Sequence, residues 1–430
     1  MIDCSPNIAK VLLKAFGQGV VPQKGLGAIA VGRKAEIESI DDDIRGAMNG
    51  QGSFRFVIGG YGTGKSFMLA LTREHSLQMG MAVMSADLSE SVLFSGSKKG
   101  QNMYRKLIAG MSVSGKQGGA METVLKKWVE RVKKDIAKRK GSDVESVTKS
   151  EVVAEIRRIT ASMSEMPLYG VFISMVGRYY SEMGSPTQYA LTWLKGEYEQ
   201  RSLAKQDLGV GTIIDDSNWF DFIRIWSEFV RHAGYKGLVL LFDEAVSIYK
   251  ISNSRSREKN YEKILSMYND VVQNTDVHIA VYVGGTPDLL QHETRGIKSY
   301  AALYTRVSEG MFVNGYSNPR GVVMHLRVLS REEVVILLSR LRDLYSIARG
   351  VDSQVTDEMV GAYSNHCYNN LGLEGALTPR NVSKGFIYIL DRISEDPSVS
   401  LDSLVKGMRI DPDRGHDTEF FPPEKPTLEI

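Results

Sequence analysis

Residues 59–66 read Gly-Gly-Tyr-Gly-Thr-Gly-Lys-Ser, a type and spacing of residues that suit phosphate binding. Glycines let successive backbone N–H groups turn toward phosphate oxygens, and the N-terminus of a following helix adds positive potential. In such a loop, a P-loop, Lys65 reaches the β- and γ-phosphates of a nucleoside triphosphate, and the Ser66 hydroxyl binds Mg²⁺. The loop residues predicted to contact the nucleotide are Gly59, Gly60, Tyr61, Gly62, Thr63, Gly64, Lys65, Ser66 and Phe67.

An acidic pair follows a second apolar stretch, residues 237–242. A buried parallel strand presents the residues that follow it at its C-terminal edge, where ligands of α/β sheets bind. We expect Asp243 to hold Mg²⁺, directly or through water, and Glu244 to act as the base that polarises the attacking water. A buried strand that ends in an acidic helix cap is the alternative. The two motifs, in their proper order in one chain, favour the catalytic interpretation.

The elements that position these residues are predicted from the apolar pattern. Four short apolar runs occur, at residues 54–58, 81–86, 237–242 and 278–283. The segments between them have apolar residues at helical spacing. Strands that alternate with helices around a P-loop predict an α/β fold with a mostly parallel sheet. Thr286 follows the fourth run, at the tip of a strand, where a polar side chain can orient the catalytic water. The sequence Gly-Gly-Thr-Pro is also typical of a turn.

The chain is long enough for more than one core. We predict an N-terminal helix with the first part of the P-loop core (1–95), a helical insertion (96–212), the second part of the core (213–328), a C-terminal helical lid (329–408) and a flexible tail (409–430).

Composition narrows the class of protein. The 430 residues are 43% hydrophobic and 24% charged, which is ordinary for a soluble globular protein. Cys4 and Cys367 give neither a disulfide framework nor a metal quartet, and the histidines lack metal-ligand spacing. Residues 1–19 resemble a capped helix more than a signal peptide, because Lys14 interrupts the apolar stretch. The two distant cysteines fit a reducing cytoplasm, so we predict a cytoplasmic protein. No stretch of about 18 apolar residues occurs, so we predict no membrane span.

One predicted helix of the insertion, residues 126–140, is strongly basic. The net charge of the chain is only +2, so any nucleic-acid binding must come from such a local patch. A helix of this kind can follow a phosphate backbone and makes DNA a candidate partner, although charged runs are more often solvated faces. Its basic residues are Lys126, Lys127, Arg131, Lys133, Lys134, Lys138, Arg139 and Lys140, opposed by Glu130 and Asp135.

A P-loop, an acidic strand end, a polar residue on the next strand and a helical lid together resemble the AAA+ ATPases, particularly the branch of origin-recognition initiators. Val31-Gly32-Arg33, upstream of the P-loop, resembles the segment that this branch places beside the adenine. The resemblance therefore adds Gly32 and Arg33 to the nucleotide contacts. The segment from the P-loop to the acidic strand is longer than a minimal AAA+ core needs, and the helical insertion accounts for that length.

The chain resembles more closely the BrxD family, ATP-binding proteins of bacteriophage-exclusion (BREX) islands. The resemblance extends over residues 8 to 405. The segments that carry it are Ile214-Asp-Asp-Ser-Asn-Trp219, Leu241-Phe-Asp-Glu-Ala245, Gly284-Gly-Thr-Pro-Asp-Leu289, Ser299-Tyr-Ala-Ala-Leu-Tyr-Thr-Arg306 and Thr378-Pro-Arg-Asn-Val382. It implies ATP and Mg²⁺ as cofactors, and other island proteins, such as an Lhr-like helicase, as partners.

The same resemblance implies three further roles. Thr286 matches a first sensor, Arg306 an arginine finger that acts on the nucleotide of a neighbouring subunit, and Arg380 a second sensor that reaches the γ-phosphate from the lid. A planar guanidinium suits the charge that develops on γ-phosphate oxygens. A local ion pair is the alternative for Arg306, and Arg295 is a rival finger. Arg380 opposes the dipole of the helix that it begins, so it calls for an anionic partner.

The resemblance implies an ATPase of phage defence that couples ATP binding and hydrolysis to DNA or partner binding, in an oligomer. Asp243-Glu-Ala-Val246 imitates a helicase box, but the chain has neither the downstream helicase motifs nor a second motor core. No Asn-Lys-x-Asp motif is present to select GTP. A regulatory or scaffold protein that binds nucleotide without significant turnover remains the alternative.

Overall fold

The computed structural model describes residues 4–161, 167–308, 318–371 and 378–407. The chain folds as two compact units, each built from separate stretches of sequence. The first unit comprises residues 1–33, 59–70 and 326–430, and the second comprises residues 34–58 and 71–325. Helix α3 (Lys65–Gln78) begins in the first unit and continues into the second.

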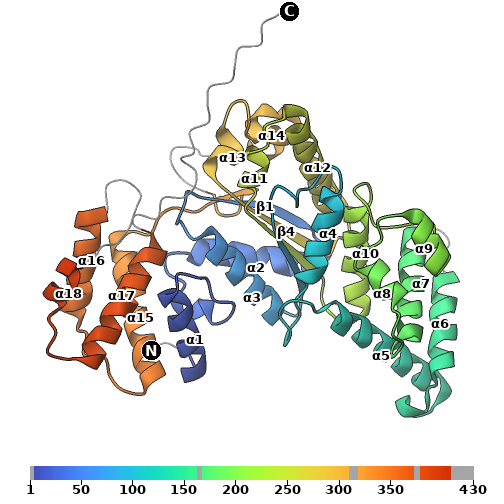
Figure 1. Ribbon diagram of the computed structural model, residues 1–430, viewed down its shortest axis with the longest axis horizontal. Coiled ribbons are helices and arrows are strands. Elements are labelled where there is room, and N and C mark those ends of the chain that lie inside the picture. The colour runs from blue at the N-terminus through green and yellow to red at the C-terminus, as the bar shows by residue number, and fades with distance from the viewer. Residues whose placement is uncertain (1–3, 162–166, 309–317, 372–377, 408–430) are drawn as a thin grey trace, which may run out of the picture. The chain divides into compact units, whose positions relative to one another are not determined.

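A parallel sheet forms the centre of the second unit (Figure 1). Its strands are β1 (Ser53–Ile58), β2 (Ala82–Asp87), β3 (Leu238–Asp243), β4 (Ile279–Gly285) and β5 (Val323–His325). Their order is β2-β3-β4-β1-β5, and every neighbouring pair is parallel. The predicted α/β class and parallel sheet are confirmed. β5 has three residues, too few for the apolar pattern to indicate a strand.

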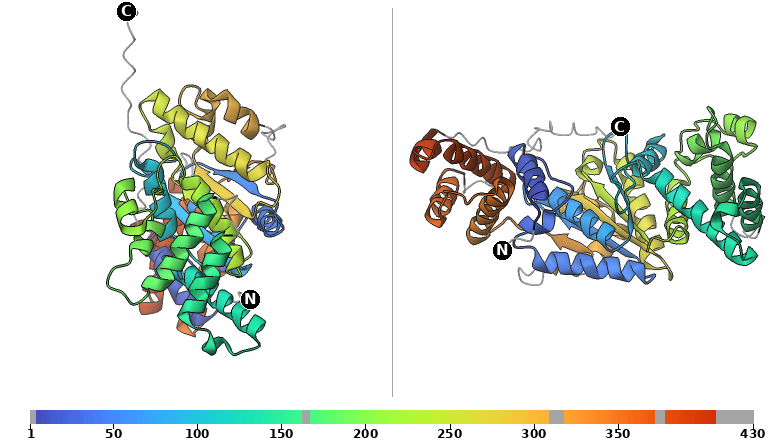
Figure 2. Two further views of the ribbon diagram at one scale, coloured as in Figure 1. Left: turned by 90° about the vertical axis from the view of Figure 1, so that its right-hand side faces the viewer. Right: turned by 90° about the horizontal axis from the view of Figure 1, so that it is seen from below.

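Helices cover both faces of the sheet, which explains why its strands are almost continuously apolar (Figure 2). Side chains alternate between the faces of a strand. Phe54 therefore contacts Tyr268 of α12 (Ser254–Val272), at 5.7 Å between ring centroids, while Arg55 contacts Asp43 of α2 (Lys34–Met48) on the opposite face.

Arg55 of β1, the strand that precedes the P-loop, forms a buried ion pair with Asp43 of α2. Their side chains are 9% and 12% exposed. Arg55 donates to both carboxylate oxygens of Asp43 and to the carbonyl oxygens of Pro319 (2.8 Å) and Gly321 (2.6 Å). Burial first, and then the Asp43 carboxylate, hold the pKa of Tyr282 well above its usual value. This pair therefore ties α2, β1 and the segment that leads into β5 together.

The predicted insertion is helical, and it shares one hydrophobic core with the sheet. The connection is α10 (Trp219–His232), where Phe229 packs on Trp128 of α5 (Met121–Lys140) and Phe172 of α7 (Pro167–Glu182). The ring centroids are 5.2 Å apart in each case. Asp216 accepts from the backbone N–H groups of Lys98 (2.5 Å) and Gln101 (3.0 Å), and so caps α4 from a distant part of the sequence.

The remaining elements of the second unit have the following bounds. They are α4 (Lys99–Ala109), α5 (Met121–Lys140), η2 (Val144–Ser146), α6 (Lys149–Ala161), α7 (Pro167–Glu182), α8 (Tyr189–Leu194), α9 (Arg201–Leu208), α11 (Val246–Tyr249), α13 (Pro287–Gln291), η3 (Ile297–Ser299) and α14 (Ala301–Ser308).

The first unit joins the N-terminal helix, the P-loop and the C-terminal helices. Its elements are α1 (Pro6–Gly17), η1 (Leu26–Ile29), the start of α3, α15 (Arg331–Arg349), α16 (Asp357–Leu371), α17 (Pro379–Glu395) and α18 (Leu401–Gly407). α1 packs on α15 and α17. The capped helix predicted in residues 1–19 is confirmed as α1, with Ser5 as its N-cap. Ser330 and Glu333 form a capping box at α15, and Thr378 caps α17. The five predicted segments stay predictions, and the tail 409–430 lies outside the described residues.

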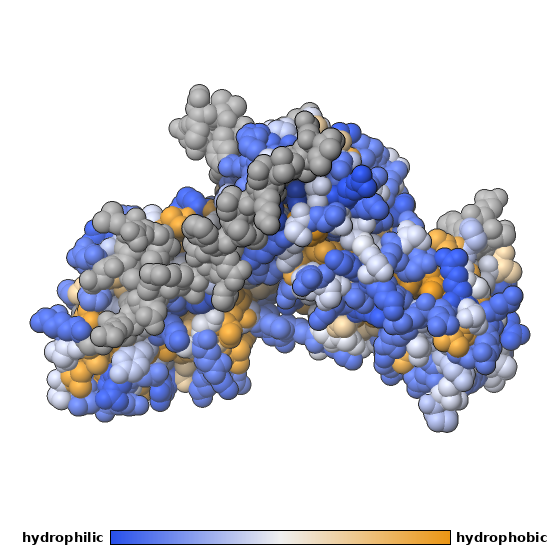
Figure 3. Space-filling view, turned by 45° about the horizontal axis from the view of Figure 1, so that its top comes forward, coloured by the Kyte–Doolittle hydropathy of each residue, from blue (hydrophilic) through white to orange (hydrophobic). Residues whose placement is uncertain are grey.

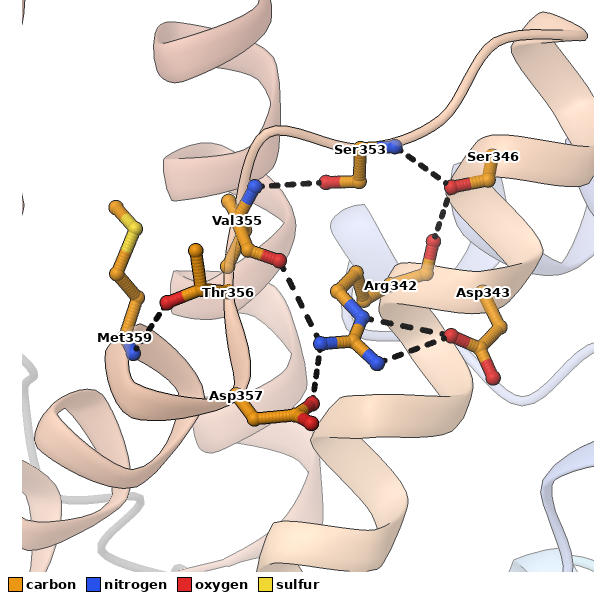
Figure 4. Close-up of polar contacts among 8 residues, drawn as sticks. All are labelled: Arg342, Asp343, Ser346, Ser353, Val355, Thr356, Asp357 and Met359. Atoms are coloured by element: carbon orange, nitrogen blue, oxygen red, sulfur yellow. Dashed lines mark hydrogen bonds and ion pairs between the residues drawn. The ribbon is translucent and has the colours of Figure 1, made fainter.

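Polar contacts hold the turn between α15 and α16 within the first unit (Figure 4). Arg342 donates to the Asp357 carboxylate at 2.5 Å, and the backbone N–H of Ser353 donates to the Ser346 hydroxyl at 3.0 Å. These bonds fix where α16 begins relative to α15.

No helix among the described residues is long and apolar enough to cross a membrane. The face drawn in Figure 3 is mostly hydrophilic, with hydrophobic residues in scattered groups.

Replacing Arg55 by Ala should lower the free energy of unfolding by about 3–5 kcal/mol, because it leaves the Asp43 carboxylate buried and unpaired. Urea unfolding followed by circular dichroism measures the change. Arg45→Ala is the control, because Arg45 pairs with Asp42 of the same helix while both side chains are more than half exposed. Its cost should stay below about 1 kcal/mol. Equal losses in the two variants would contradict a structural role for the buried pair.

Candidate functional site

The P-loop is curled around its own lysine. Lys65 Nζ donates to the carbonyl oxygens of Gly59 and Gly60, both at 2.9 Å, and the Thr63 hydroxyl donates to Gly60 at 2.9 Å. Gly62 and Gly64 have φ values of 72° and 94°, in the region that favours glycine. Phosphate oxygens are charged acceptors and bind an ammonium more strongly than carbonyls do. The loop thus holds Lys65 at the centre of a phosphate-sized turn.

Arg33 lies in the first unit and stabilises the P-loop through hydrogen bonds. Its side chain is buried, and one guanidinium nitrogen donates to the carbonyl oxygens of Thr63 (2.9 Å) and Arg327. Gly32 has a φ of 68°, and a Cβ there would lie 2.2 Å from the Glu333 carboxylate. Gly32 and Arg33 therefore connect the P-loop with the start of α15. Their predicted contact with the nucleotide stays a prediction.

The N-terminus of α17 lies against the apex of the P-loop. A Cβ on Gly62 would lie 2.2 Å from Cγ2 of Thr378, the N-cap of α17. Arg380, in the first turn of that helix, is exposed and donates to the Tyr61 hydroxyl at 3.3 Å. The partial positive charge of a helix N-terminus and a guanidinium thus meet at the loop. An anion bound in the loop would stabilise both.

The second unit places an acidic edge at the C-terminal ends of its strands. Asp243 ends β3, and its oxygen Oδ1 accepts from the backbone N–H of Glu244 at 2.8 Å. Glu244 is exposed and has a φ of 57°, a left-handed conformation that is unusual for a residue other than glycine. Such conformations cost about 1–3 kcal/mol and cluster at functional sites. Within this unit the strained turn therefore sets the direction of the Glu244 carboxylate.

Thr286 occupies the strand end between β1 and β3. β4 lies between these strands, and its last residue, Gly285, is in register with Ile58, the residue before the P-loop. The Thr286 hydroxyl oxygen is buried and has no hydrogen-bond partner among the described residues. An unsatisfied buried hydroxyl costs about 1–3 kcal/mol. A water or phosphate oxygen at this edge would satisfy it.

Asp87 and Arg73 belong to the same edge and were not predicted. Asp87 ends β2 and is in register with Asp243. Arg73 of α3 donates to the Ser85 hydroxyl at 2.8 Å. Burial lowers the pKa of Arg73, and the Asp87 carboxylate acts in the opposite direction. Parallel pairing of the strands at 81–86 and 237–242 was the signal that would have placed Asp87 beside Asp243.

The donor atoms present suit Mg²⁺. Ser66 of the first unit offers a hydroxyl oxygen, and Asp243 of the second unit offers a carboxylate oxygen. Mg²⁺ prefers hard oxygen ligands of both kinds. Their predicted binding of Mg²⁺ stays a prediction. Among the described residues no group of three or more His, Cys, Asp or Glu side chains is placed to hold a metal.

The two candidate fingers have different surroundings. Arg306, on α14, donates to the carbonyl oxygen of Ala302 at 2.8 Å, one turn back on its own helix, and forms no ion pair with any residue that the structure describes. Arg295 donates to the Ile251 carbonyl at 3.3 Å and lies 5.4 Å from the Tyr249 ring centroid. Arg295 is therefore part of the local packing, whereas nothing described supports the ion-pair alternative for Arg306.

The predicted basic helix is α5, which ends at Lys140. Ion pairs involve Lys126, Lys133, Arg139 and Lys140. Half of its basic residues are thus neutralised locally.

A family model described as BREX system ATP-binding protein BrxC/D matches residues 4–409, which include every residue of the candidate site. The chain belongs to this family. No curated protein matches the chain. Membership identifies an ATP-binding protein of a phage-defence system, and it agrees with the curled P-loop around Lys65.

Arg33→Ala should weaken ATP binding at least about 10-fold, because hydrogen bonds from a charged group contribute about 1.5–3 kcal/mol. Isothermal titration calorimetry measures the affinity, and the exposed neighbour Lys34→Ala is the control. If Arg33 acts by holding the loop, inorganic tripolyphosphate should lose affinity as well. Loss for ATP with no change for tripolyphosphate would show instead that Arg33 contacts the nucleoside.

Proposed function

We propose that this protein is a Mg²⁺-dependent ATPase of the AAA+ type, which couples ATP binding and hydrolysis to the binding of DNA or a partner protein in BREX phage defence. The observation that carries the proposal is the strained Glu244, which directly follows the Asp243 strand end in a chain with a curled P-loop. A protein that only bound ATP would not need a costly backbone conformation at the base.

Each residue has a defined part in the proposed hydrolysis. Lys65 binds the β- and γ-phosphates, while Ser66 and Asp243 supply oxygen ligands to Mg²⁺. Glu244 accepts the proton of the water that attacks the γ-phosphorus, and the bond from that phosphorus to the β,γ-bridging oxygen breaks. Thr286 orients the same water through its hydroxyl.

Two guanidinium groups stabilise the transition state in this proposal. Arg380 is supported by its bond to Tyr61 of the P-loop and by the helix N-terminus that carries it. Arg306 acts as the finger of a neighbouring copy, so the active form is a homo-oligomer. The absence of an ion pair for Arg306 among the described residues supports this role, since a finger must be able to reach another subunit's nucleotide.

The proposed setting is the bacterial cytoplasm, where ATP and phage DNA are both present. Other proteins of the defence island, such as an Lhr-like helicase, are the proposed protein partners. A scaffold that binds ATP without turnover is an outcome of the first experiment below.

Lys65→Ala should weaken ATP binding, whereas Glu244→Gln should bind ATP normally and lose about 10² to 10⁴ in turnover, because only the base is removed. Calorimetry measures binding, and phosphate release measures turnover. The conservative Asp288→Asn, at an exposed position after Thr286, is the control and should keep the parental rate. Unchanged turnover in Glu244→Gln would reject the catalytic base, and no turnover in the parent with or without DNA would favour the scaffold.

Arg306→Ala should lower turnover by about 10³- to 10⁵-fold, as expected for an arginine finger. Arg295→Ala is measured beside it, because Arg295 is the rival candidate for the finger. Specific activity of the parent should rise with protein concentration, because the finger acts only in an assembled oligomer. Mixing Arg306→Ala with Glu244→Gln should restore activity, since one interface can then combine an intact base with an intact finger. Activity that is independent of concentration, with no rescue on mixing, would reject the role in trans.

A further inference from the structure

Helix α5 separates its basic residues into two groups by their partners. One group is neutralised by carboxylates, two of which come from α6: Lys133 pairs with Glu130 at 2.9 Å, Arg139 with Glu155 at 2.9 Å, Lys140 with Glu151, and Lys126 with Glu122 at 4.0 Å. A hydrogen bond from Lys140, together with bonds from the backbone and hydroxyl of Thr148, lowers the pKa of Glu151 to about 2. The charges of these four basic residues are therefore balanced by carboxylates of the protein itself.

The other group consists of Lys127, Arg131, Lys134 and Lys138, which we call the α5 stripe. All four are exposed, and none forms an ion pair within the part of the chain that the structure describes. Their spacing of four, three and four residues places them within an arc of about 60° and over a length of about 16 Å. They form a continuous positive line along one side of α5.

Like charges lie next to one another in the α5 stripe, and Lys127 shows their effect. Burial, and then the charge of Arg131, lower the pKa of Lys127, whose ammonium lies 3.8 Å above the Tyr235 ring. Like charges four residues apart on a helix destabilise it. Two acidic residues, Glu130 and Asp135, lie between Lys127 and Lys138 on α5, and Glu130 is bonded to Lys133. An external anion would relieve the repulsion that the protein itself leaves.

We propose that the α5 stripe binds the phosphodiester backbone of a nucleic acid. The inference rests on the proposed function, and it assigns the nucleic-acid contact to the α5 stripe instead of the whole basic helix. A line of four cations over about 16 Å fits a polyanion better than a small anion, because one strand of a duplex carries a phosphate every ~3.4 Å along the axis. Basic side chains without base-reading partners contact the backbone irrespective of sequence.

The core of the second unit connects this surface with the acidic edge. Trp128, on the buried side of α5, packs on Phe229 of α10, and α10 packs on β3, which ends in Asp243. Nucleic acid bound to the stripe would therefore lie on the unit that carries Asp243 and Glu244.

The test compares two full-length variants with equal charge changes. The stripe variant is Lys127→Gln, Arg131→Gln, Lys134→Gln and Lys138→Gln, and the control is Lys126→Gln, Lys133→Gln, Arg139→Gln and Lys140→Gln. Fluorescence anisotropy measures Kd for labelled 30-bp DNA, single-stranded DNA and single-stranded RNA across a range of KCl concentrations. The arm with the tightest parental binding identifies the nucleic acid.

The stripe variant should lose about 100-fold in affinity at low salt, and its salt slope should fall by about 3 to 4 for duplex or about 3 for a single strand. The slope of the control should change by less than about 1. A milder variant, Lys134→Gln with Lys138→Gln, should lower the slope by about 1.5 to 2 and serves if the fourfold change impairs folding, as judged by circular dichroism.

Equal salt slopes in the stripe and control variants would overturn the proposal. Binding of polyglutamate, without binding of any nucleic acid, would overturn it in favour of an acidic protein partner. ATP turnover measured without nucleic acid tests the proposed ATPase function independently of the α5 stripe. A stripe variant that hydrolyses ATP at the parental basal rate but binds nucleic acid as the parent does would reject the α5 stripe alone.

Discussion

The close fit around the P-loop glycines is the constraint on which the first unit depends. Gly62 has no room for a Cβ because Thr378 of the lid packs against it, and Gly59 faces the Thr63 hydroxyl. The buried Arg33 adds hydrogen bonds from the other side of the loop. The loop conformation is therefore fixed jointly by segments that are more than 300 residues apart in the sequence.

The second unit meets a different requirement, which is to present carboxylates at one edge without burying their charge. Mostly apolar strands keep the sheet rigid, and the strand carboxylates Asp87 and Asp243 are the last residues of β2 and β3. The turn at Glu244 stores backbone strain there, held by a bond from Ala245 N–H to the Gly284 carbonyl at 3.0 Å. A rigid sheet and a strained tip together orient the Glu244 carboxylate more precisely than a flexible loop would.

Local signals predicted most of the fold, because caps and apolar runs depend on neighbouring residues. The capped N-terminal helix and the central strands are examples. The internal use of Arg33 was not predictable, since its acceptors are carbonyls brought close by folding. The division of charge on α5 was hidden for the same reason, as two of the carboxylates that neutralise it come from α6. Site residues at motif positions followed from spacing, whereas their partners required the structure.

The central claim is that the P-loop and the acidic strand end serve one hydrolysis site. An experimental structure with Mg²⁺ and a non-hydrolysable ATP analogue tests this claim most directly. The account predicts Lys65 within hydrogen-bond distance of the β- and γ-phosphates, Mg²⁺ bound by Ser66, and the Glu244 carboxylate facing the γ-phosphate. A nucleotide held away from residues 59–66, or a Glu244 carboxylate directed away from the bound triphosphate, would contradict it.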